Sequence, residues 1–342
     1  MMNGIKMTKA RKGLRAAALT ALCVLLSACD MMHQDDGDCS TKLRVKLTYD
    51  YNMKFADAFA HEVKNVTLYA FGQDGKLAYT KTESADIINA NGYMEVDDLT
   101  PGIYDLQVWA EGEDRHPNSY VYGQAVMNES SWDDLTCFVN ETATDISHDL
   151  TPLYWGRAEK QDLSELPQEV RTAVVNLHKN TNVIRVVLQH ASGKDVNPDD
   201  FEFSITDDNT RLAADNSLIP HSTVIYHPWA TYGGEAGVET QTKAQTTASA
   251  AIAEMTVNRL FTSNRPMLTI TNRTNGKTVL SIPLIDYVLL VKGNYNRSMS
   301  DQEYLDRQDE YNMTFFLQDD GSWLAASSII NSWRVVLSSV DL

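Results

Sequence analysis

The chain has 342 residues, with 46 acidic and 29 basic side chains and a formal net charge of −17. A field of this sign repels phosphates, which excludes a nucleic-acid partner held by overall charge. The length corresponds to about two domains, each large enough to bury a core.

The first 28 residues have the layout of a secretory signal. Basic residues from Lys6 to Arg15 precede an apolar run from Ala16 to Leu26, and two small residues stand immediately before Cys29. The apolar run is short for a membrane span, which takes roughly 20 residues. A cysteine directly after Leu-Ser-Ala resembles a bacterial lipobox, so we expect a signal peptide over residues 1–28 and lipidation of Cys29. An ordinary signal peptide with a chance cysteine is the alternative.

Processing at this site leaves a strongly acidic protein. The removed segment holds five basic residues and no acidic one, so the formal charge falls from −17 by five to −22. We therefore expect the membrane attachment to be covalent lipid rather than a polybasic patch. Residues 29–41 are interpreted as a lipidated acidic tether. An N-terminal β-sandwich domain over residues 42–165 and a C-terminal one over residues 166–342 are expected to follow.

Two cysteines remain once the signal and the lipid site are set aside. Cys39 and Cys137 could form a disulfide, because an exported protein meets an oxidising environment, or they could stay separate. Their spacing alone does not decide between these alternatives. The chain has no Cys-x-x-Cys pattern, and we predict no metal site and no cofactor.

Short alternating segments dominate the first half of the chain. Leu43, Val45 and Leu47 alternate with polar residues, which is the period of a half-buried strand. Turn residues at 72–75 and 101–102 separate further strand-like runs, which cover residues 66–71, 76–80, 93–96 and 103–110. Many short strands with turns between them predict an all-β fold of the antiparallel sandwich type.

The second half continues this pattern after a connector at residues 161–168. Strand-like runs cover residues 173–177, 183–188, 201–205, 255–261, 267–271, 277–282, 313–317 and 333–337. Asn275-Gly276 between two of them predicts a tight hairpin. Ser300 followed by Glu303 fits a capping box and predicts a helix toward Tyr311. Residues 233–250 are small and polar, and we expect a long mobile loop there.

No catalytic constellation is recognisable, and we predict that the protein is not an enzyme. The segment 275–278, Asn-Gly-Lys-Thr, ends like a phosphate loop but has Thr271 where that motif needs glycine. Asp306, Asp309 and Glu310 with Arg307 are interpreted as a solvated or salt-bridged face. The carboxylates leave a hydrolase as a third hypothesis.

Three aromatic residues suggest an alternative kind of surface. Trp109, Tyr120 and Tyr122 could form a platform on which sugar rings stack, provided that they are exposed in a row. Packing in a core is the other interpretation of these side chains. A surface glycan-binding lipoprotein is therefore kept as the alternative function.

Several short segments along the mature chain share an order and a spacing. They are Ser27-Ala28-Cys29-Asp30, Asp38-Cys39, Tyr49-Asp50-Tyr51-Asn52, Ala58-Phe59-Ala60, residues 66–71 with Asp74-Gly75, Leu99-Thr100-Pro101-Gly102-Ile103-Tyr104, Leu153-Tyr154-Trp155-Gly156, residues 305–311, Trp323-Leu324 and Ile330-Asn331-Ser332-Trp333. Together they resemble the fimbrillin-A-associated anchor family of the Bacteroidales, the FimB-type fimbrial subunits. Ser332 departs from the glycine expected before Trp333.

The resemblance implies two consecutive transthyretin-like antiparallel β-sandwich domains behind a lipoprotein signal peptide. It implies a non-enzymatic, surface-exposed lipoprotein of the cell outer membrane that anchors a fimbria and terminates its assembly. The partners would be fimbrillin, the major subunit, and other accessory subunits, joined by β-strand exchange. The last strand, with Trp333, Val335 and Leu337, is the candidate exchange segment.

Overall fold

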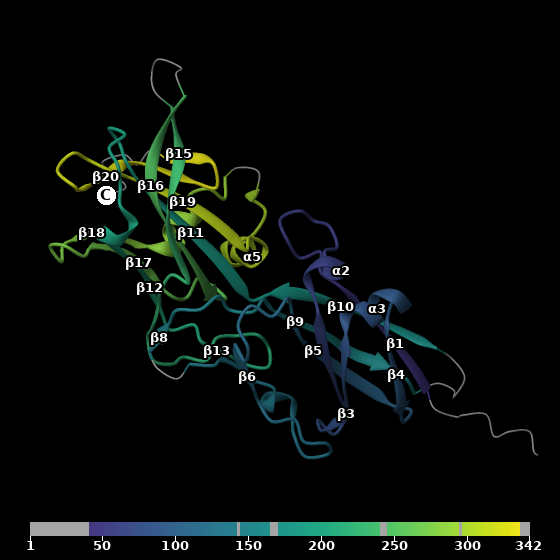
Figure 1. Cartoon of the computed structure of the whole chain (residues 1–342). Helices are drawn as coiled ribbons and strands as arrows, with labels where there is room; N and C mark the ends of the chain where they lie inside the picture. Colours follow the sequence, from purple (N-terminus) through teal and green to yellow (C-terminus); the bar gives the residue numbers. More distant parts are fainter. Residues whose placement is uncertain (1–40, 142–143, 165–169, 240–244, 294–295, 336–342) are drawn as a thin grey trace, which may run out of the picture.

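The computed structural model describes residues 41–141, 144–164, 170–239, 245–293 and 296–335. Among these residues strands predominate and helices are few, which confirms the all-β class. The described residues form two lobes that follow one another along the long axis of the molecule (Figure 1). The predicted signal peptide, tether, Cys29, Cys39 and Leu337 lie outside the described residues. Within them, no helix is long and apolar enough to cross a membrane.

The N-terminal lobe is built on a seven-stranded sheet with the order β3-β2-β5-β9-β10-β1-β4. The two outer strands, β3 and β4, lie close to each other at one place. There Nζ of Lys81 in β3 donates a hydrogen bond to the carbonyl oxygen of Glu95 in β4 at 2.8 Å. The sheet thereby wraps around its own core, in which Val45, Val66 and Leu68 are fully buried. The elements are β1 (Thr41–Thr48), α2 (Phe59–Glu62), β2 (Asn65–Phe71), β3 (Leu77–Ser84), α3 (Ala85–Asn91), β4 (Met94–Leu99), β5 (Ile103–Glu111), β9 (Leu153–Asp162) and β10 (Arg171–Lys179).

The C-terminal lobe is a sandwich of a six-stranded sheet, β15-β16-β11-β19-β20-β21, on a five-stranded sheet, β18-β17-β12-β14-β8. Alternate residues of both sheets, such as Ile184, Val186, Phe203 and Ile205, fill the core between them. The elements are β8 (Asp145–Ile146), β11 (Thr181–His190), η2 (Pro198–Asp200), β12 (Phe201–Asp207), β14 (Val224–Tyr226), β15 (Ala230–Glu239), β16 (Gln245–Asn258), β17 (Met267–Asn272), β18 (Thr278–Pro283), α4 (Leu284–Leu289), α5 (Asp301–Arg307), β19 (Glu310–Leu317), β20 (Trp323–Ile330) and β21 (Trp333–Val335).

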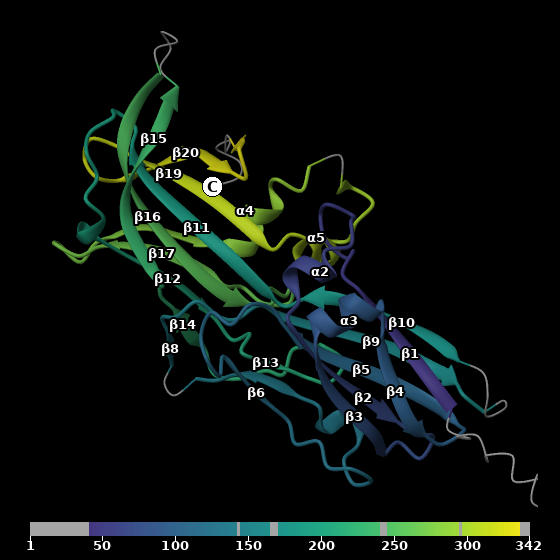
Figure 2. The same ribbon diagram turned by 45° about the vertical axis from the view of Figure 1, so that its right-hand side comes forward.

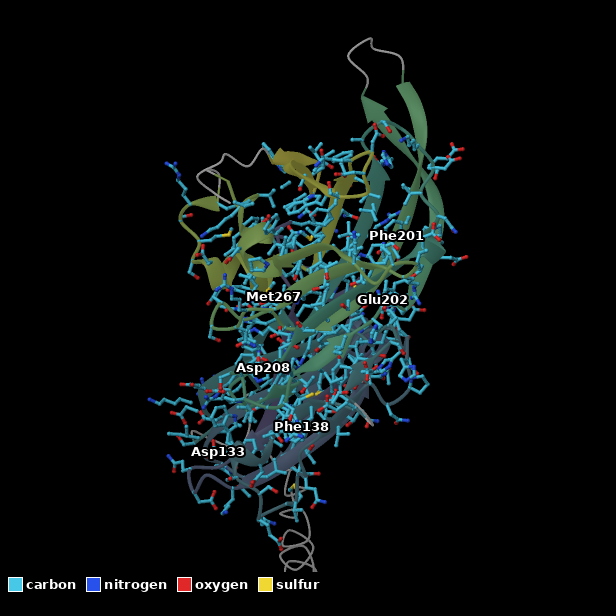
Figure 3. All side chains as sticks on the ribbon, turned by 90° about the vertical axis from the view of Figure 1, so that its left-hand side faces the viewer. Asp133, Phe138, Phe201, Glu202, Asp208 and Met267 are labelled. Carbon is cyan, nitrogen blue, oxygen red and sulfur yellow. The ribbon has the colours of Figure 1, made fainter. Side chains whose placement is uncertain are left out.

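A small three-stranded sheet joins the two cores. It consists of β6 (Tyr120–Tyr122), β7 (Cys137–Val139) and β13 (Arg211–Leu212), with η1 (Trp132–Asp134) beside it. Its buried residues share one cluster with Trp109 of the N-terminal lobe and with the C-terminal core. Figure 3 shows this order along the long axis, from Asp133 through Phe138 to Met267 and Phe201.

The expected antiparallel pairing holds for most neighbouring strands but not for all of them. Three strand pairs are parallel: β1 with β10, β11 with β19, and β14 with β8. Parallel strands need a long connection, so the two strands of such a pair are distant in the sequence. The alternation of polar and apolar residues along one strand does not show which strand lies next to it. The sandwich architecture is confirmed, but with mixed sheets.

The sheets also do not divide at the expected boundary between residues 165 and 166. β10 follows that point in the sequence and yet pairs with β1 and β9 of the N-terminal lobe. Conversely, β8 precedes it and pairs with β14 of the C-terminal lobe. The chain therefore passes between the lobes after β5, before β9 and after β10, where Asn180 begins the C-terminal lobe.

The predicted mobile loop at residues 233–250 is wrong for residues 233–239 and 245–250, whereas residues 240–244 lie outside the described part of the chain. β15 and β16 form a long hairpin with an unbroken register from Ala230 opposite Glu254 to Glu239 opposite Gln245. Small residues permit the close packing: a Cβ on Gly234 would lie 2.6 Å from Cδ1 of Ile252. The small, weakly hydrophobic residues of this segment therefore belong to closely paired strands and not to a loop.

Local turn and cap signals are confirmed. β17 and β18 form the predicted hairpin, but its loop spans residues 273–277, and of Asn275 and Gly276 only the glycine has a positive φ, of 68°. The Ser300 side chain accepts a hydrogen bond from the backbone N–H of Glu303 at 3.0 Å and caps α5. This helix ends at Arg307, earlier than the predicted Tyr311, because the chain turns into β19.

Candidate functional site

Segments that are far apart in the sequence meet where the two lobes join. We call this region the junction and define it by Tyr49, Glu62, Tyr154, Lys179 and Asp309. These residues line an open cleft of about 470 Å³ between the lobes. Tyr49, Tyr154 and Asp309 all belong to segments on which the family resemblance rests. Three of the segments that carry the resemblance therefore meet at the junction.

Lys179 bridges the two lobes at the centre of the junction. Its Nζ lies 3.1 Å from Oε2 of Glu62 in the N-terminal lobe and 2.6 Å from Oδ2 of Asp309 in the C-terminal lobe. The lysine side chain is only 11% exposed. Burial lowers the pKa of Lys179, but the charges of Asp309 and Glu62 outweigh it and hold the pKa above its usual value. The ammonium group therefore stays charged and neutralises carboxylates of both lobes.

Two buried tyrosines complete the polar floor of the junction. The hydroxyl of Tyr154 donates to Oε2 of Glu62 at 3.1 Å. The rings of Tyr49 and Tyr154 meet edge to face, with centroids 5.2 Å apart. Burial raises the pKa of both hydroxyls, so both remain neutral. Glu62 is thus fixed by a lysine and a tyrosine at once.

The loop after β1 contacts the C-terminal end of α5. The guanidinium of Arg307 lies over the ring of Tyr51 at 4.0 Å from its centroid. The carbonyl oxygen of Arg307 accepts a hydrogen bond from the N–H of Met53 at 3.1 Å. Tyr51 in turn stacks on His178 of β10, with centroids 4.1 Å apart. Burial lowers the pKa of His178 to about 4, so this imidazole is neutral near pH 7.

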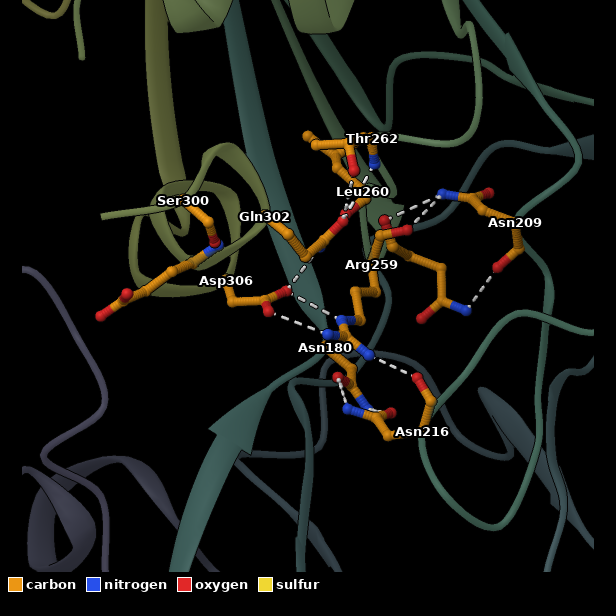
Figure 4. Close-up of polar contacts among 11 residues, drawn as sticks. Asn180, Asn209, Asn216, Arg259, Leu260, Thr262, Ser300, Gln302 and Asp306 are labelled. Atoms are coloured by element: carbon orange, nitrogen blue, oxygen red, sulfur yellow. Dashed lines mark hydrogen bonds and ion pairs between the residues drawn. The ribbon is translucent and has the colours of Figure 1, made fainter. Parts of the chain in front are cut away.

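A buried ion pair between Arg259 and Asp306 holds α5 to the end of β16 (Figure 4). Arg259 donates from Nε to Oδ1 and from Nη2 to Oδ2 of Asp306, both at 2.8 Å. Gln302 donates to the same Oδ1 at 2.9 Å. Both ionic side chains are shielded, at 14% and 7% exposure. The pair is bidentate and fully hydrogen-bonded, which is the geometry in which a buried ion pair is retained.

The residue at which the chain crosses between the lobes is fixed by the same network. Asn180 donates to Oδ1 of Asn216 at 2.7 Å and accepts from Nδ2 of Asn216 at 3.0 Å (Figure 4). Arg259 donates from Nη1 to the carbonyl oxygen of Asn216. The crossing point is therefore tied to α5 through three linked side chains. The site couples two lobes mechanically, and its ionisable groups are engaged with one another.

The sequence did not identify most of this site. Lys179, Glu62, Arg259, Asn180 and Asn216 carried no motif that marks them. The salt-bridged interpretation of Asp306, Arg307 and Asp309 agrees with their ion pairs, including that of Arg307 with Glu303 at 2.9 Å. In the part of the chain that the structure describes, no group of His, Cys, Asp and Glu is placed to hold a metal ion.

The three aromatic residues that could have formed a sugar-stacking platform follow the other interpretation and pack into the protein. Trp109 is 2% exposed and donates from Nε1 to the carbonyl oxygen of Leu135, and Tyr120 is 7% exposed and donates to that of Thr151. Tyr122 is half-buried, and its hydroxyl donates to Oε1 of Glu111 at 2.6 Å. The segment after residue 120 folds back across β5 and covers its outer face. The three side chains therefore pack as core and rim, and they form no stacking surface.

Of the two cysteines that could form a disulfide, only Cys137 lies among the described residues. Cys137, at the start of β7, is 1% exposed, and burial raises the pKa of its thiol. Cys39 lies outside the described residues, so the pairing stays a prediction.

The predicted exchange segment forms an edge of the six-stranded sheet. β21 pairs with β20 through Ile330 opposite Trp333 and Ser328 opposite Val335. No other described strand pairs with its far side. Trp333 is 69% exposed. An unpaired edge of this kind offers backbone groups to an incoming strand. Its use in strand exchange stays a prediction.

Comparison with known proteins gives a consistent set of matches. The family model of fimbrillin-A associated anchor proteins Mfa1 and Mfa2 matches residues 35–339. A crystal structure named "putative adhesin", from Bacteroides thetaiotaomicron VPI-5482, is 31% identical, covering 87% of this chain and 98% of that one, with a TM-score of 0.74. Structures named "putative polysaccharide binding proteins" from the same strain are 28% identical, covering 88% of this chain and 100% of that one, with a TM-score of 0.73.

The fimbrial anchor protein Mfa2 from Porphyromonas gingivalis shares the fold. It is 17% identical, covers 88% of this chain and 100% of that one, and has a TM-score of 0.64. A comparison with curated proteins gives no match. The family model covers well over half of the chain, and the chain therefore belongs to the family of fimbrillin-A associated anchor proteins.

Proposed function

We propose that this protein is a non-enzymatic lipoprotein subunit that anchors a surface fimbria to the outer membrane. Lipid on Cys29 would hold the membrane end, and β-strand exchange with fimbrillin would hold the fibre and terminate its assembly. Membership in the anchor family supports the fimbrial role, and the Porphyromonas relative is itself named a fimbrial anchor. Other accessory subunits of the fimbria are further expected partners.

The arrangement of the two lobes is the observation that carries this proposal. β1 begins at Thr41, the last residue of the expected tether, and its start lies at the opposite end of the molecule from the C-terminal lobe (Figures 1 and 2). The C-terminal lobe presents the edge strand β21. Between these ends, the junction binds the lobes with ion pairs and stacked rings. A protein built this way can join a membrane at one end to a polymer at the other.

The alternative of a glycan-binding lipoprotein has less support. A relative from Bacteroides thetaiotaomicron carries a polysaccharide-binding name. In this chain, however, Trp109 and Tyr120 are buried and hydrogen-bonded to backbone oxygens. An exposed aromatic row was the feature that would have favoured sugar stacking, and the described residues do not form it at this place.

Replacing Cys29 with alanine is expected to release the protein and its fimbriae into the medium. The reason is that a lipid chain is the proposed source of membrane attachment, and its removal leaves an acidic protein with no affinity for the membrane. The measurement is the fraction of subunit and of fimbrillin in cell-free medium, by immunoblot. Cys39→Ala is the matched control and should leave both on the cell. Retention of the Cys29→Ala protein at the cell surface would contradict the anchoring proposal.

A further inference from the structure

The strand that follows the expected tether lies inside the sheet and has a neighbour on each side. β1 pairs with β10 at six positions, from Leu43 opposite Arg171 to Thr48 opposite Asn176. On its other side it pairs with β4, from Thr41 opposite Leu99 to Val45 opposite Met94. Any pull on the tether is therefore transmitted first to a strand that is held by two ladders of backbone hydrogen bonds.

The direction of β1 decides how these ladders would be loaded. β1 and β10 are parallel, and both end at the junction, where Tyr49 and Lys179 line the same cleft. The tether joins the opposite end of β1, at Thr41. The chain crosses between the two lobes at the junction side, after β5, before β9 and after β10, and the small three-stranded sheet adds contacts along the outer face of the N-terminal sheet. A pull between tether and C-terminal lobe therefore acts along the axis of β1 (Figure 2).

Loading along the strand axis differs from peeling. When a strand is peeled from its end, the hydrogen bonds of the ladder break one after another under a small force. When a strand is pulled along its axis, all bonds of both ladders carry the load together and must yield in one step. Forced unfolding is governed by the height of this barrier and not by the equilibrium stability.

We propose that β1 is a mechanical clamp, which resists extraction in shear against β10 and β4 when the molecule is pulled between its tether and its C-terminal lobe. This inference rests on the proposed anchoring function, since an anchor is the protein that carries such a load. The clamp gives the N-terminal lobe a function of its own: it fastens the membrane tether to the junction. Buried side chains of β1, such as Leu43 and Val45, lock the strand in register.

The test is single-molecule pulling of the unlipidated mature chain, held by peptide tags at its two ends. Val45→Ala in β1 is compared with Val66→Ala in β2, and both valines are 0% exposed in the same core. Both variants should lose similar stability in chemical denaturation. At constant force, the N-terminal lobe of Val45→Ala should unfold about tenfold faster than that of the unsubstituted chain. The unfolding rate of Val66→Ala should stay within about twofold of the unsubstituted rate, because contacts that persist at the barrier do not change the unfolding rate.

The outcomes separate the clamp from simple stability. Equal acceleration by both variants, or a larger one by Val66→Ala, would overturn the proposal. If either core variant does not fold, Lys46→Gly in β1 and Thr80→Gly in β3 provide a second comparison at exposed positions, with the same expected order. The pulling measurement uses the isolated protein and is independent of the Cys29→Ala experiment. The clamp can therefore be contradicted while the anchoring proposal stands, and the anchoring proposal can be contradicted while the clamp stands.

Discussion

Replacing Asp306 with asparagine is expected to lower the free energy of unfolding of the C-terminal lobe by about 3 kcal/mol. The substitution keeps the shape of the side chain but removes its charge, so the buried guanidinium of Arg259 loses its partner. The asparagine amide also turns a donor toward Nη2 or Nε, where Asp306 presents two acceptors at 2.8 Å. Chemical denaturation followed by tryptophan fluorescence measures this loss.

The same helix provides the matched control. Asp301 pairs with Nζ of Lys292 at 2.7 Å, but its side chain is 58% exposed. An ion pair in water contributes about 0–1 kcal/mol, so Asp301→Asn should change the stability by less than about 1 kcal/mol. A loss at Asp306 no larger than that at Asp301 would mean that the buried pair does not hold α5.

Replacing Lys179 with methionine is expected to weaken the junction by about 2–3 kcal/mol. Methionine fills a similar volume, but the carboxylates of Glu62 and Asp309 are left without their shared cation. They are 33% and 25% exposed, so water relieves part of the penalty, and the expected loss is at the low end for a broken ion pair. The readouts are the unfolding midpoint and the rate of proteolysis in the loop after β1, which the junction holds against α5.

Lys64→Met is the control for this variant, because Lys64 lines the same cleft but is exposed. It should leave both readouts close to those of the unsubstituted protein. If the two lysine variants behave alike, the bridge between the lobes is not what stabilises the junction.

Local features of the chain could be predicted because they depend on neighbouring residues. Phe201, Phe203 and Ile205 are buried and Glu202 is exposed, as the period of two requires. The turn at Gly276 and the cap at Ser300 follow from backbone geometry within four residues. Such signals need no knowledge of the rest of the fold.

The junction could not be predicted because its partners are distant in the sequence. Lys179 lies 130 residues from Asp309, and Arg259 lies 47 residues from Asp306. The parallel pairing of β1 with β10 is hidden for the same reason. Tyr49, Tyr154 and Asp309 stand in segments that carry the family resemblance, but only the fold shows that they lie at one place.

These features give a physical account of an anchor subunit. In the proposed role, the tether would load β1 and the N-terminal sheet would transmit the load to the junction. Lys179 and Arg307 would then carry it into the C-terminal lobe. β11, which begins next to Asn180, is paired on both sides, with β16 and β19. A force that enters there spreads through the six-stranded sheet toward its edges, where the fibre is expected to dock.

The most direct test of this account is to identify what the protein holds at the cell surface. A tagged chain would be purified from the native outer membrane after mild cross-linking, and the captured proteins would be identified by mass spectrometry. We expect fimbrillin and accessory subunits to be captured, and we expect their loss when residues 333–342 are deleted. Capture of no fimbrial subunit by the intact chain would contradict the account.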